Sequence, residues 1–356
     1  MSHITASMVK ELRDKTGAGM MDCKQALTES GGDLETAIDW LRKKGLSKAA
    51  RKSDRIAAQG LIGVVSDGTA GAVVEVNSET DFVARNSEFQ DMVRRIASLA
   101  AKAKGDMGAL LAAGYPGTSR TVETHVKEMV ATIGENMGVR RTAALATDKG
   151  VIADYVHNKA GEGLGKIGVL VALESTGDKG KLTALGRQIA MHIAAASPLA
   201  VTPEEIDKSV VEKERAIYRE QAQASGKAQD IVEKMVEGRL RKEFFGQAAL
   251  MNQVFVIDGK ASVAEAVKAA EQTVGAPIRI AGFVRYALGE GIEKKAEDFA
   301  AEVAKAAGAA APPAKKDQKQ APAERAPGTK TAAKTGQPKT PADAPSGSKP
   351  SGKKKR

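Results

Sequence analysis

One order of predicted secondary structure occurs twice along the chain, and this repeat constrains the fold more than any other feature of the sequence. Residues 60–79, GLIGVVSDGTAGAVVEVNSE, are two apolar runs around an Asp-Gly turn, and the apolar spacing over 87–103 predicts a helix. Residues 151–175 again contain two apolar runs around a Gly-rich turn, and a helix is expected over 181–197. Asp-Gly between such runs favours a β-hairpin, and apolar residues three and four apart favour a helix. We therefore predict an α+β protein whose core has two related halves, each an antiparallel sheet covered by helices.

Two segments outside the repeat predict additional helices. Residues 1–55 contain three short runs of helical spacing separated by glycines, which bury too little for a catalytic domain, so we expect a docking module. Residues 203–247 contain an apolar stripe at three- and four-residue steps among dense charge, which predicts a coiled-coil hairpin. The residues of this stripe are Ile206, Val210, Ile217, Ile231, Met235, Val236 and Leu240. This stripe is wide enough to predict self-association or a partner surface.

The predicted boundaries are 1–55 for the N-terminal helical module, 56–147 for the first core half, 148–202 and 248–287 for the second core half, 203–247 for the helical hairpin, 288–308 for a C-terminal helical module and 309–356 for a disordered basic tail.

The net charge of +10 is concentrated in the tail. Residues 312–356 contain twelve Lys and Arg, three Asp and Glu, and no large apolar residue, so they cannot bury enough surface to fold. Such a tail would bind polyanions with an affinity that falls with salt. The rest of the chain is nearly neutral, with 42 basic and 41 acidic residues, and the whole chain has only twelve aromatic residues. We therefore do not expect the folded part to bind nucleic acid.

The cellular compartment is inferred from cysteine usage and hydropathy. The single cysteine, Cys23, excludes an internal disulfide and fits a reducing compartment. The N-terminus has no apolar core of a signal peptide, and no apolar run approaches the roughly 18 residues that span a bilayer. We expect a cytoplasmic protein without membrane attachment.

No group of residues predicts a catalytic site, a metal centre or a bound cofactor. The four histidines are scattered without ligand spacing. The glycine clusters at 160–168 and 288–294 lack the strand–GxxxxGK[ST]–helix context of a phosphate loop, and Ile167 follows Lys166 where Ser or Thr would hold magnesium. Turns explain these glycines better. We expect a protein that is not an enzyme.

The segment VNSETDFVARN, residues 76–86, allows two interpretations of its phenylalanine. It joins a predicted strand to a predicted helix, so Phe82 could pack beneath that helix while Asp81 bonds backbone amides in the turn. This local interpretation is favoured by the pattern alone. The polar residues on both sides instead indicate a surface loop, from which Phe82 could enter a pocket on a partner.

Several blocks of the sequence resemble bacterial elongation factor Ts. They are MVKELRDKTGAGMMDCKQAL at 8–27, VVEVNSETDFVARNSEF at 73–89, VVEKE at 210–214, KMVEGRLRK at 234–242 and GEGIEK at 289–294. The resemblance covers roughly residues 2–305 and leaves out the tail. It implies a guanine-nucleotide exchange factor for the GTPase elongation factor Tu.

The resemblance also implies which residues contact the GTPase. The TDFV loop would disturb the phosphate and magnesium site of the GTPase, with the phenylalanine wedged between its helices. The N-terminal module would touch the same domain of the GTPase, and the second core half would reach another domain. The implied contact residues are Arg13, Met20, Met21, Thr80, Asp81, Phe82, Val83 and His157.

Overall fold

The computed structural model describes residues 4–293, apart from the side chains of Leu46 and Lys48. The chain divides into two compact units, Met1–Ala296 and Glu297–Arg356, and the described residues belong to the first unit. The predicted tail and residues 294–308 of the predicted C-terminal helical module lie outside the described residues. Within residues 4–293, no helix is long and apolar enough to cross a membrane.

The N-terminal module contains the three expected helices, α1 (Ala6–Thr16), α2 (Met20–Glu29) and α3 (Leu34–Ala50). The Thr5 hydroxyl accepts a hydrogen bond from the Met8 N–H at the start of α1, and Gly17 ends that helix in the left-handed conformation. The module has its own small core, which consists of Leu12, Cys23, Ala26, Leu27 and Ala37.

The α+β class with two antiparallel sheets is confirmed. The first half contains β1 (Gln59–Ser66), β2 (Ala70–Ser78), α4 (Asp81–Arg85), α5 (Ser87–Lys102), α6 (Met107–Ala112), α7 (Val122–Ile133) and β3 (Met137–Ala146). The second half contains β4 (Gly150–His157), β5 (Leu164–Gly165), β6 (Ile167–Glu174), α8 (Lys179–Ala196), α12 (Val263–Val274) and β7 (Arg279–Ala287). The strand orders are β3-β2-β1-β5 and β4-β6-β7. β5 comes from the Gly-rich turn of the second half but pairs with β1 of the first sheet.

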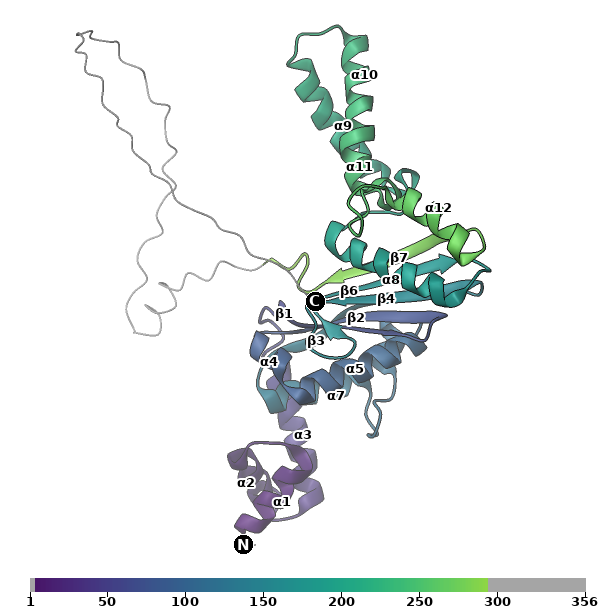
Figure 1. Cartoon of the computed structure of the whole chain (residues 1–356). Helices are drawn as coiled ribbons and strands as arrows, with labels where there is room; N and C mark the ends of the chain where they lie inside the picture. Colours follow the sequence, from purple (N-terminus) through teal and green to yellow (C-terminus); the bar gives the residue numbers. More distant parts are fainter. Residues whose placement is uncertain (1–3, 294–356) are drawn as a thin grey trace, which may run out of the picture. The chain divides into compact units, whose positions relative to one another are not determined.

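The core is built in four layers (Figure 1). Helices α5 and α7 cover the outer face of the first sheet, and α8 and α12 cover the outer face of the second. The inner faces pack on each other through an apolar cluster that includes Ile62, Val73, Ile152 and Leu170. The apolar runs predicted from the sequence therefore supply the side chains between the helices and the first sheet, between the two sheets, and between the second sheet and its helices.

The two halves follow the same plan in detail. α7 and α12 each end at a glycine in the left-handed conformation, Gly134 and Gly275, and each is followed by the third strand of its sheet. Both third strands carry a β-bulge six residues after that glycine, at Arg140 and Ala281. The repeat therefore supplies an internal comparison, position by position, between the halves.

A buried carboxylate fastens the end of β7 to the first sheet. The bulge lets Arg140 and Arg141 both reach the fully buried Glu75 of β2, at 3.1 Å from Arg140 Nη1 and 2.6 Å from Arg141 Nε. Glu75 also accepts hydrogen bonds from the Asn77 amide and from the Gly289 N–H. Residues 288–293, the described part of the predicted C-terminal helical module, therefore form a turn held on the first sheet.

The inserted segment forms the expected hairpin, which projects from the second half (Figure 1). Its helical parts are Pro203–Glu205, α9 (Lys208–Gln223), α10 (Gln229–Arg239), a π-helical turn at Leu240–Phe244, α11 (Phe245–Ala248) and Leu250–Asn252. The two long helices bury Val236 and Leu240 of the predicted stripe between them, together with Ala222 and Val232. Of the other predicted stripe residues, Val210, Ile217 and Ile231 remain exposed.

Candidate partner-binding surface

The TDFV segment forms α4, a helix of only five residues that turns Phe82 outward. The Phe82 side chain is 74% exposed, whereas the next two residues, Val83 and Ala84, are buried in the core of the first half. The structure therefore contradicts the local interpretation in which Phe82 packs beneath the following helix. Val83 anchors the segment and does not present its side chain at the surface.

Side-chain hydrogen bonds hold both ends of this short helix. The Glu135 carboxylate accepts two bonds from Thr80, one from the backbone N–H at 2.9 Å and one from the hydroxyl at 2.7 Å. At the other end, the Gln90 amide donates to the Ala84 carbonyl, and the Asn86 side chain caps the start of α5. A single helical turn is unstable by itself, so these contacts fix where Phe82 points.

Asp81 lies between two cations. Its carboxylate is 2.8 Å from the Arg85 guanidinium, and Lys166 of the second half also lies within electrostatic reach of both groups. Burial lowers the pKa of Lys166, and Asp81 opposes this shift. The Asp81 charge is therefore partly neutralised within this protein, which the sequence alone did not indicate.

Lys166 also connects α4 to the predicted contact residue His157. The Lys166 amine donates to the Gly60 carbonyl at 3.3 Å, and its backbone N–H donates to the His157 carbonyl at 3.0 Å. His157 is exposed at the end of β4, with Nδ1 at 3.2 Å from the Tyr155 hydroxyl. The TDFV segment and His157 therefore lie at the same end of the two halves.

The structure contains a second group of exposed apolar side chains, which was not predicted from the sequence. Leu199, Val254, Val256 and Ile257 are between 43% and 61% exposed on two loops that follow α8 and the hairpin. The segment QVFVIDG, residues 253–259, lies within the predicted second core half, but Phe255 is the one large apolar residue of this segment that is buried. The sequence gives no signal for this difference, because Val254, Phe255 and Val256 are all apolar and the segment forms a loop.

The loop that carries Val254 and Val256 is held by a buried histidine at the C-terminal end of α8. His192 Nε2 lies 2.8 Å from the Gln253 side-chain oxygen, and His192 Nδ1 accepts a hydrogen bond from the Val256 N–H. Burial lowers the pKa of His192, although the bond to Gln253 opposes this. A neutral ring satisfies both contacts, so the exposed valines stand on a rigid support.

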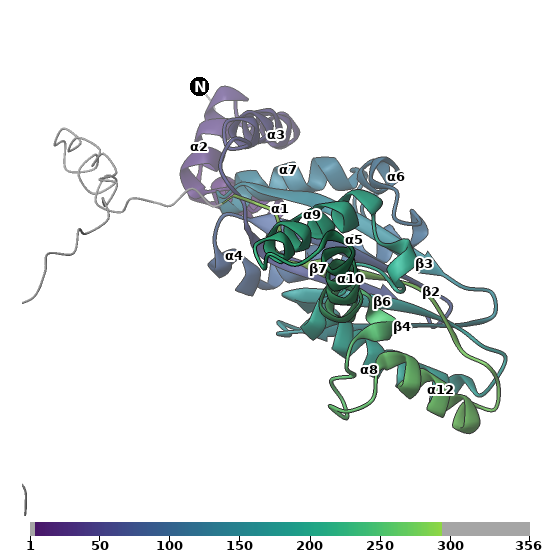
Figure 2. The same ribbon diagram turned by 90° about the horizontal axis from the view of Figure 1, so that it is seen from above.

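The N-terminal module presents its own exposed residues near the turn between α1 and α2. Met20 and Met21 are 59% and 77% exposed, and Arg13 is also exposed. The module contacts the core where α3 packs against α7 (Figures 1 and 2). Gly45 of α3 permits this close approach, because a Cβ there would lie 3.0 Å from the Ala131 Cβ.

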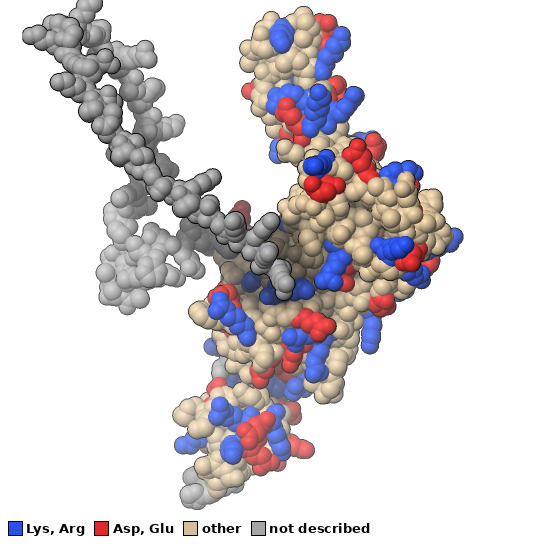
Figure 3. Space-filling view, in the orientation of Figure 1, with Lys and Arg blue, Asp and Glu red and all other residues tan. Residues whose placement is uncertain are grey.

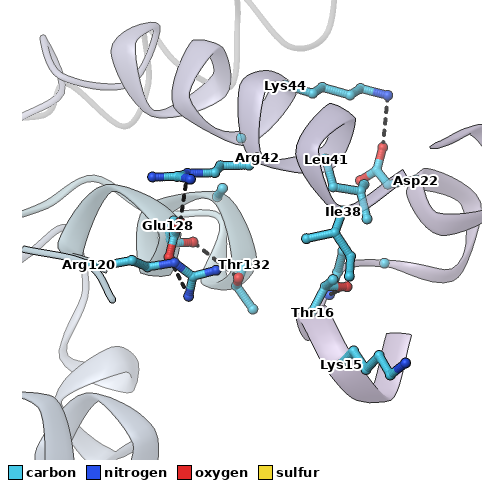
Figure 4. Close-up of a pocket in the computed structure, with 14 residues that line it drawn as sticks. Lys15, Thr16, Asp22, Ile38, Leu41, Arg42, Lys44, Arg120, Glu128 and Thr132 are labelled. Atoms are coloured by element: carbon cyan, nitrogen blue, oxygen red, sulfur yellow. Dashed lines mark hydrogen bonds and ion pairs between the residues drawn. The ribbon is translucent and has the colours of Figure 1, made fainter. Parts of the chain in front are cut away.

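A cavity of about 140 Å³ separates parts of the module from α7. Figure 4 shows Glu128 of α7 between Arg42 of α3 and Arg120, with Nη1 of Arg120 at 2.9 Å. Burial raises the pKa of Glu128 and the two arginines lower it, with burial the larger effect. The contact between Glu128 and Arg42 links the module to the core. It does not involve Met20 and Met21, which stay exposed.

The charged side chains of the described part are mixed in sign. Figure 3 shows Lys and Arg interspersed with Asp and Glu on the face in view. Among residues 4–293, no group of three or more His, Cys, Asp or Glu side chains is placed to hold a metal ion. The described residues define a protein with exposed apolar side chains on a body of mixed charge.

Comparisons with known proteins identify the family. The family model described as elongation factor TS matches residues 79–290. The elongation factor Ts of Rhizobium leguminosarum bv. trifolii is 61% identical over 306 residues, which cover 86% of this chain and 99% of that protein. The elongation factor Ts of Parvibaculum lavamentivorans is 62% identical over 307 residues, with the same coverage. The chain belongs to the elongation factor Ts family, as the resemblance indicated, and so to the elongation factors of protein synthesis.

Proposed function

We propose that this protein is a guanine-nucleotide exchange factor that promotes GDP release from elongation factor Tu in the cytoplasm. The family membership supports this function. The observation that carries the residue-level proposal is the 74% exposure of Phe82 on a short helix whose ends are fixed. A rigid, exposed aromatic side chain is typical of the residues that supply most of the binding energy at protein interfaces.

The mechanism needs no catalytic group of this chain. A factor that binds the nucleotide-free GTPase more tightly than the GDP-bound form must weaken GDP binding by the same factor, because the two binding equilibria form a closed cycle. Insertion of Phe82 would disturb the phosphate and magnesium site of the GTPase, where a divalent cation neutralises the phosphate charge. Asp81, which is paired with Arg85 in an exposed and therefore weak ion pair, would add a negative charge near that site.

Further contacts would come from the other exposed residues. We expect Arg13, Met20 and Met21 of the module, together with Thr80 at the start of α4, to lie at the edge of the same interface. His157 and the exposed loops with Leu199 and Val254 would bind another domain of the GTPase. Large apolar side chains on loops supported by the core favour this assignment.

The proposal is tested by measuring the rate at which elongation factor Tu releases a fluorescent GDP analogue at increasing concentrations of the present protein. We expect Phe82→Ala to lower the maximal release rate about 30-fold, which corresponds to the roughly 2 kcal/mol of an interface hot spot. Met191→Ala, which truncates an exposed apolar residue of α8 outside the proposed surfaces, serves as the matched control and should retain the wild-type rate. Wild-type protein that leaves release unchanged, or Phe82→Ala protein as active as wild type, would show that the proposal is wrong.

Two accessory properties are proposed on narrower grounds. The exposed Val210, Ile217 and Ile231 provide an apolar surface on the hairpin for self-association. The basic tail, which lies outside the described residues, would bind polyanions weakly. Deletion of residues 312–356 should remove that binding at low salt and leave nucleotide exchange intact.

A further inference from the structure

The turn between α7 and β3, residues 134–136, contacts two segments that are far apart in sequence. Glu135 accepts both hydrogen bonds of Thr80, as described above. The Asn136 amide donates to the carbonyls of Ser53 and Arg55, at 3.3 and 2.7 Å, in the linker that joins α3 to β1. The turn therefore fixes the start of the TDFV segment on one side and the end of the N-terminal linker on the other.

Other bonds of the same turn reinforce both attachments. The Asn136 N–H donates to the Glu79 carboxylate, which is also paired with Arg55 at 3.5 Å. The Lys52 amine donates to the Gly134 carbonyl. The linker, the TDFV segment and the turn are thus joined in one network of polar contacts.

The internal repeat shows that these side chains are not needed to make the turn itself. In the second half, Gly275 and the bulge at Ala281 occupy the same relative positions as Gly134 and the bulge at Arg140. The residues that then correspond to Glu135 and Asn136 are Ala276 and Pro277, which have no polar side chain. The polar pair occurs in the half that carries both attached segments, so its bonds serve these segments.

The Thr80 side chain also bonds to another segment and not to its own helix. Thr80 is the residue that precedes α4, where a threonine hydroxyl commonly bonds a backbone N–H of its own helix. The Thr80 hydroxyl makes no such bond and donates to Glu135 instead. The orientation of a five-residue helix, and with it the direction of Phe82, is set from outside that helix.

We propose that Glu135 and Asn136 are positioning residues for nucleotide exchange. Glu135 holds Phe82 in its binding direction through Thr80, and Asn136 holds the N-terminal module, with Met20 and Met21, through the linker. This inference rests on the proposed function, because it concerns how two of its contact surfaces are held relative to each other.

The test for Glu135 is a double-mutant cycle in the nucleotide-release assay. We expect Glu135→Ala to lower the maximal release rate about tenfold, whereas Glu135→Gln, which keeps an acceptor oxygen for Thr80, should restore it to within about twofold of wild type. Glu123→Ala, which removes an exposed carboxylate of α7 paired with Lys127, is the control. In protein that already carries Phe82→Ala, Glu135→Ala should cause no further loss.

Asn136 is tested in the same way against the module. Asn136→Ala should lower the release rate in wild-type and Phe82→Ala protein alike, and should have no further effect once Met20 and Met21 are both alanine. Melting temperatures of all variants show whether they are folded.

The outcomes separate the two proposals. If Phe82→Ala slows release but Glu135→Ala has no effect, or has an equal effect with and without Phe82, the positioning role of Glu135 is excluded and the proposed function stands. Equal effects of Asn136→Ala with and without the methionines exclude its role likewise. If Phe82→Ala releases GDP as fast as wild type, the proposed function itself fails.

Discussion

Replacement of Glu75 by glutamine should destabilise the protein in a pH-dependent way. Glu75 is fully buried, and its carboxylate is the shared acceptor for Arg140, Arg141, Asn77 and the Gly289 N–H. Glutamine has nearly the same volume but no charge. The substitution therefore removes the carboxylate from two adjacent arginines without opening a cavity.

The expected size follows from the exposure of the partners. Removal of one member of a buried ion pair costs about 3–5 kcal/mol, because the remaining charge is left unpaired. The Arg140 and Arg141 side chains are 30% and 28% exposed, so water relieves part of this cost. We expect a loss of about 2–3 kcal/mol and a melting temperature about 3–5 °C lower than that of wild type.

The pH dependence has a definite sign. Burial by itself would raise the pKa of Glu75, but the hydrogen bonds from Gly289, Arg141 and Asn77, together with the Arg141 charge, lower it below the ordinary value. A carboxylate with a lowered pKa stabilises the fold above its unfolded pKa of about 4.3, and this stabilisation is lost as the pH falls through the folded pKa. The difference between wild type and Glu75→Gln should therefore shrink as the pH decreases from about 6 to about 3.

Calorimetric or circular-dichroism melting of the full chain measures this difference. Glu174→Gln is the matched control, because Glu174 lies on β6 in an exposed pair with Arg279, and its loss should cost less than about 1 kcal/mol. A Glu75→Gln protein that melts within about 1 °C of wild type would refute the argument. A stability difference that stays constant down to pH 3 would refute its electrostatic part.

Two further predictions concern the second half and the hairpin. His192 is buried in its neutral form with a lowered pKa, so the stability of the protein should fall as the pH drops below about 6.5. His192→Gln should therefore make the melting temperature depend less on pH between pH 7.5 and 5. A melting temperature of the wild type that depends on pH no more than that of the variant would contradict this. Ile217→Glu combined with Ile231→Glu should abolish self-association in sedimentation equilibrium, and a wild-type protein that is monomeric at all concentrations would remove the basis for that surface.

The parts of the fold that the sequence predicted are those with a local periodic pattern. The apolar residues of α5 recur at helical spacing, and Phe89, Met92 and Ile96 are buried as this spacing requires. The strands β1 and β2 flank an Asp-Gly turn whose Asp67 accepts bonds from two backbone N–H groups. Such contacts lie within a few residues of each other, so a short window of sequence contains the information.

The candidate site was less predictable because its geometry depends on distant partners. Phe82 faces the solvent on a short helix whose first residue is preceded by Thr80, and Thr80 bonds to Glu135, which is 55 residues away in the sequence. The sequence did not predict the role of Glu75, because all its partners except Asn77 come from β3 and from a turn 214 residues away. Val254 and Val256 lie in a segment predicted for the second core half, because a short apolar run in a loop resembles a buried strand in composition.

The two-residue strand β5 has a consequence for the order in which the protein can be completed during synthesis. Leu164 and Gly165 pair with Gly63 and Ile62, so the outer edge of the first sheet is covered by residues made about a hundred positions later. At translation rates of about 5–20 residues per second, that edge stays open for roughly 5–20 s after β1 leaves the ribosome. An open edge of apolar strand readily pairs with another chain. The Gly-rich turn that closes this edge is thus the last piece of a sheet begun much earlier.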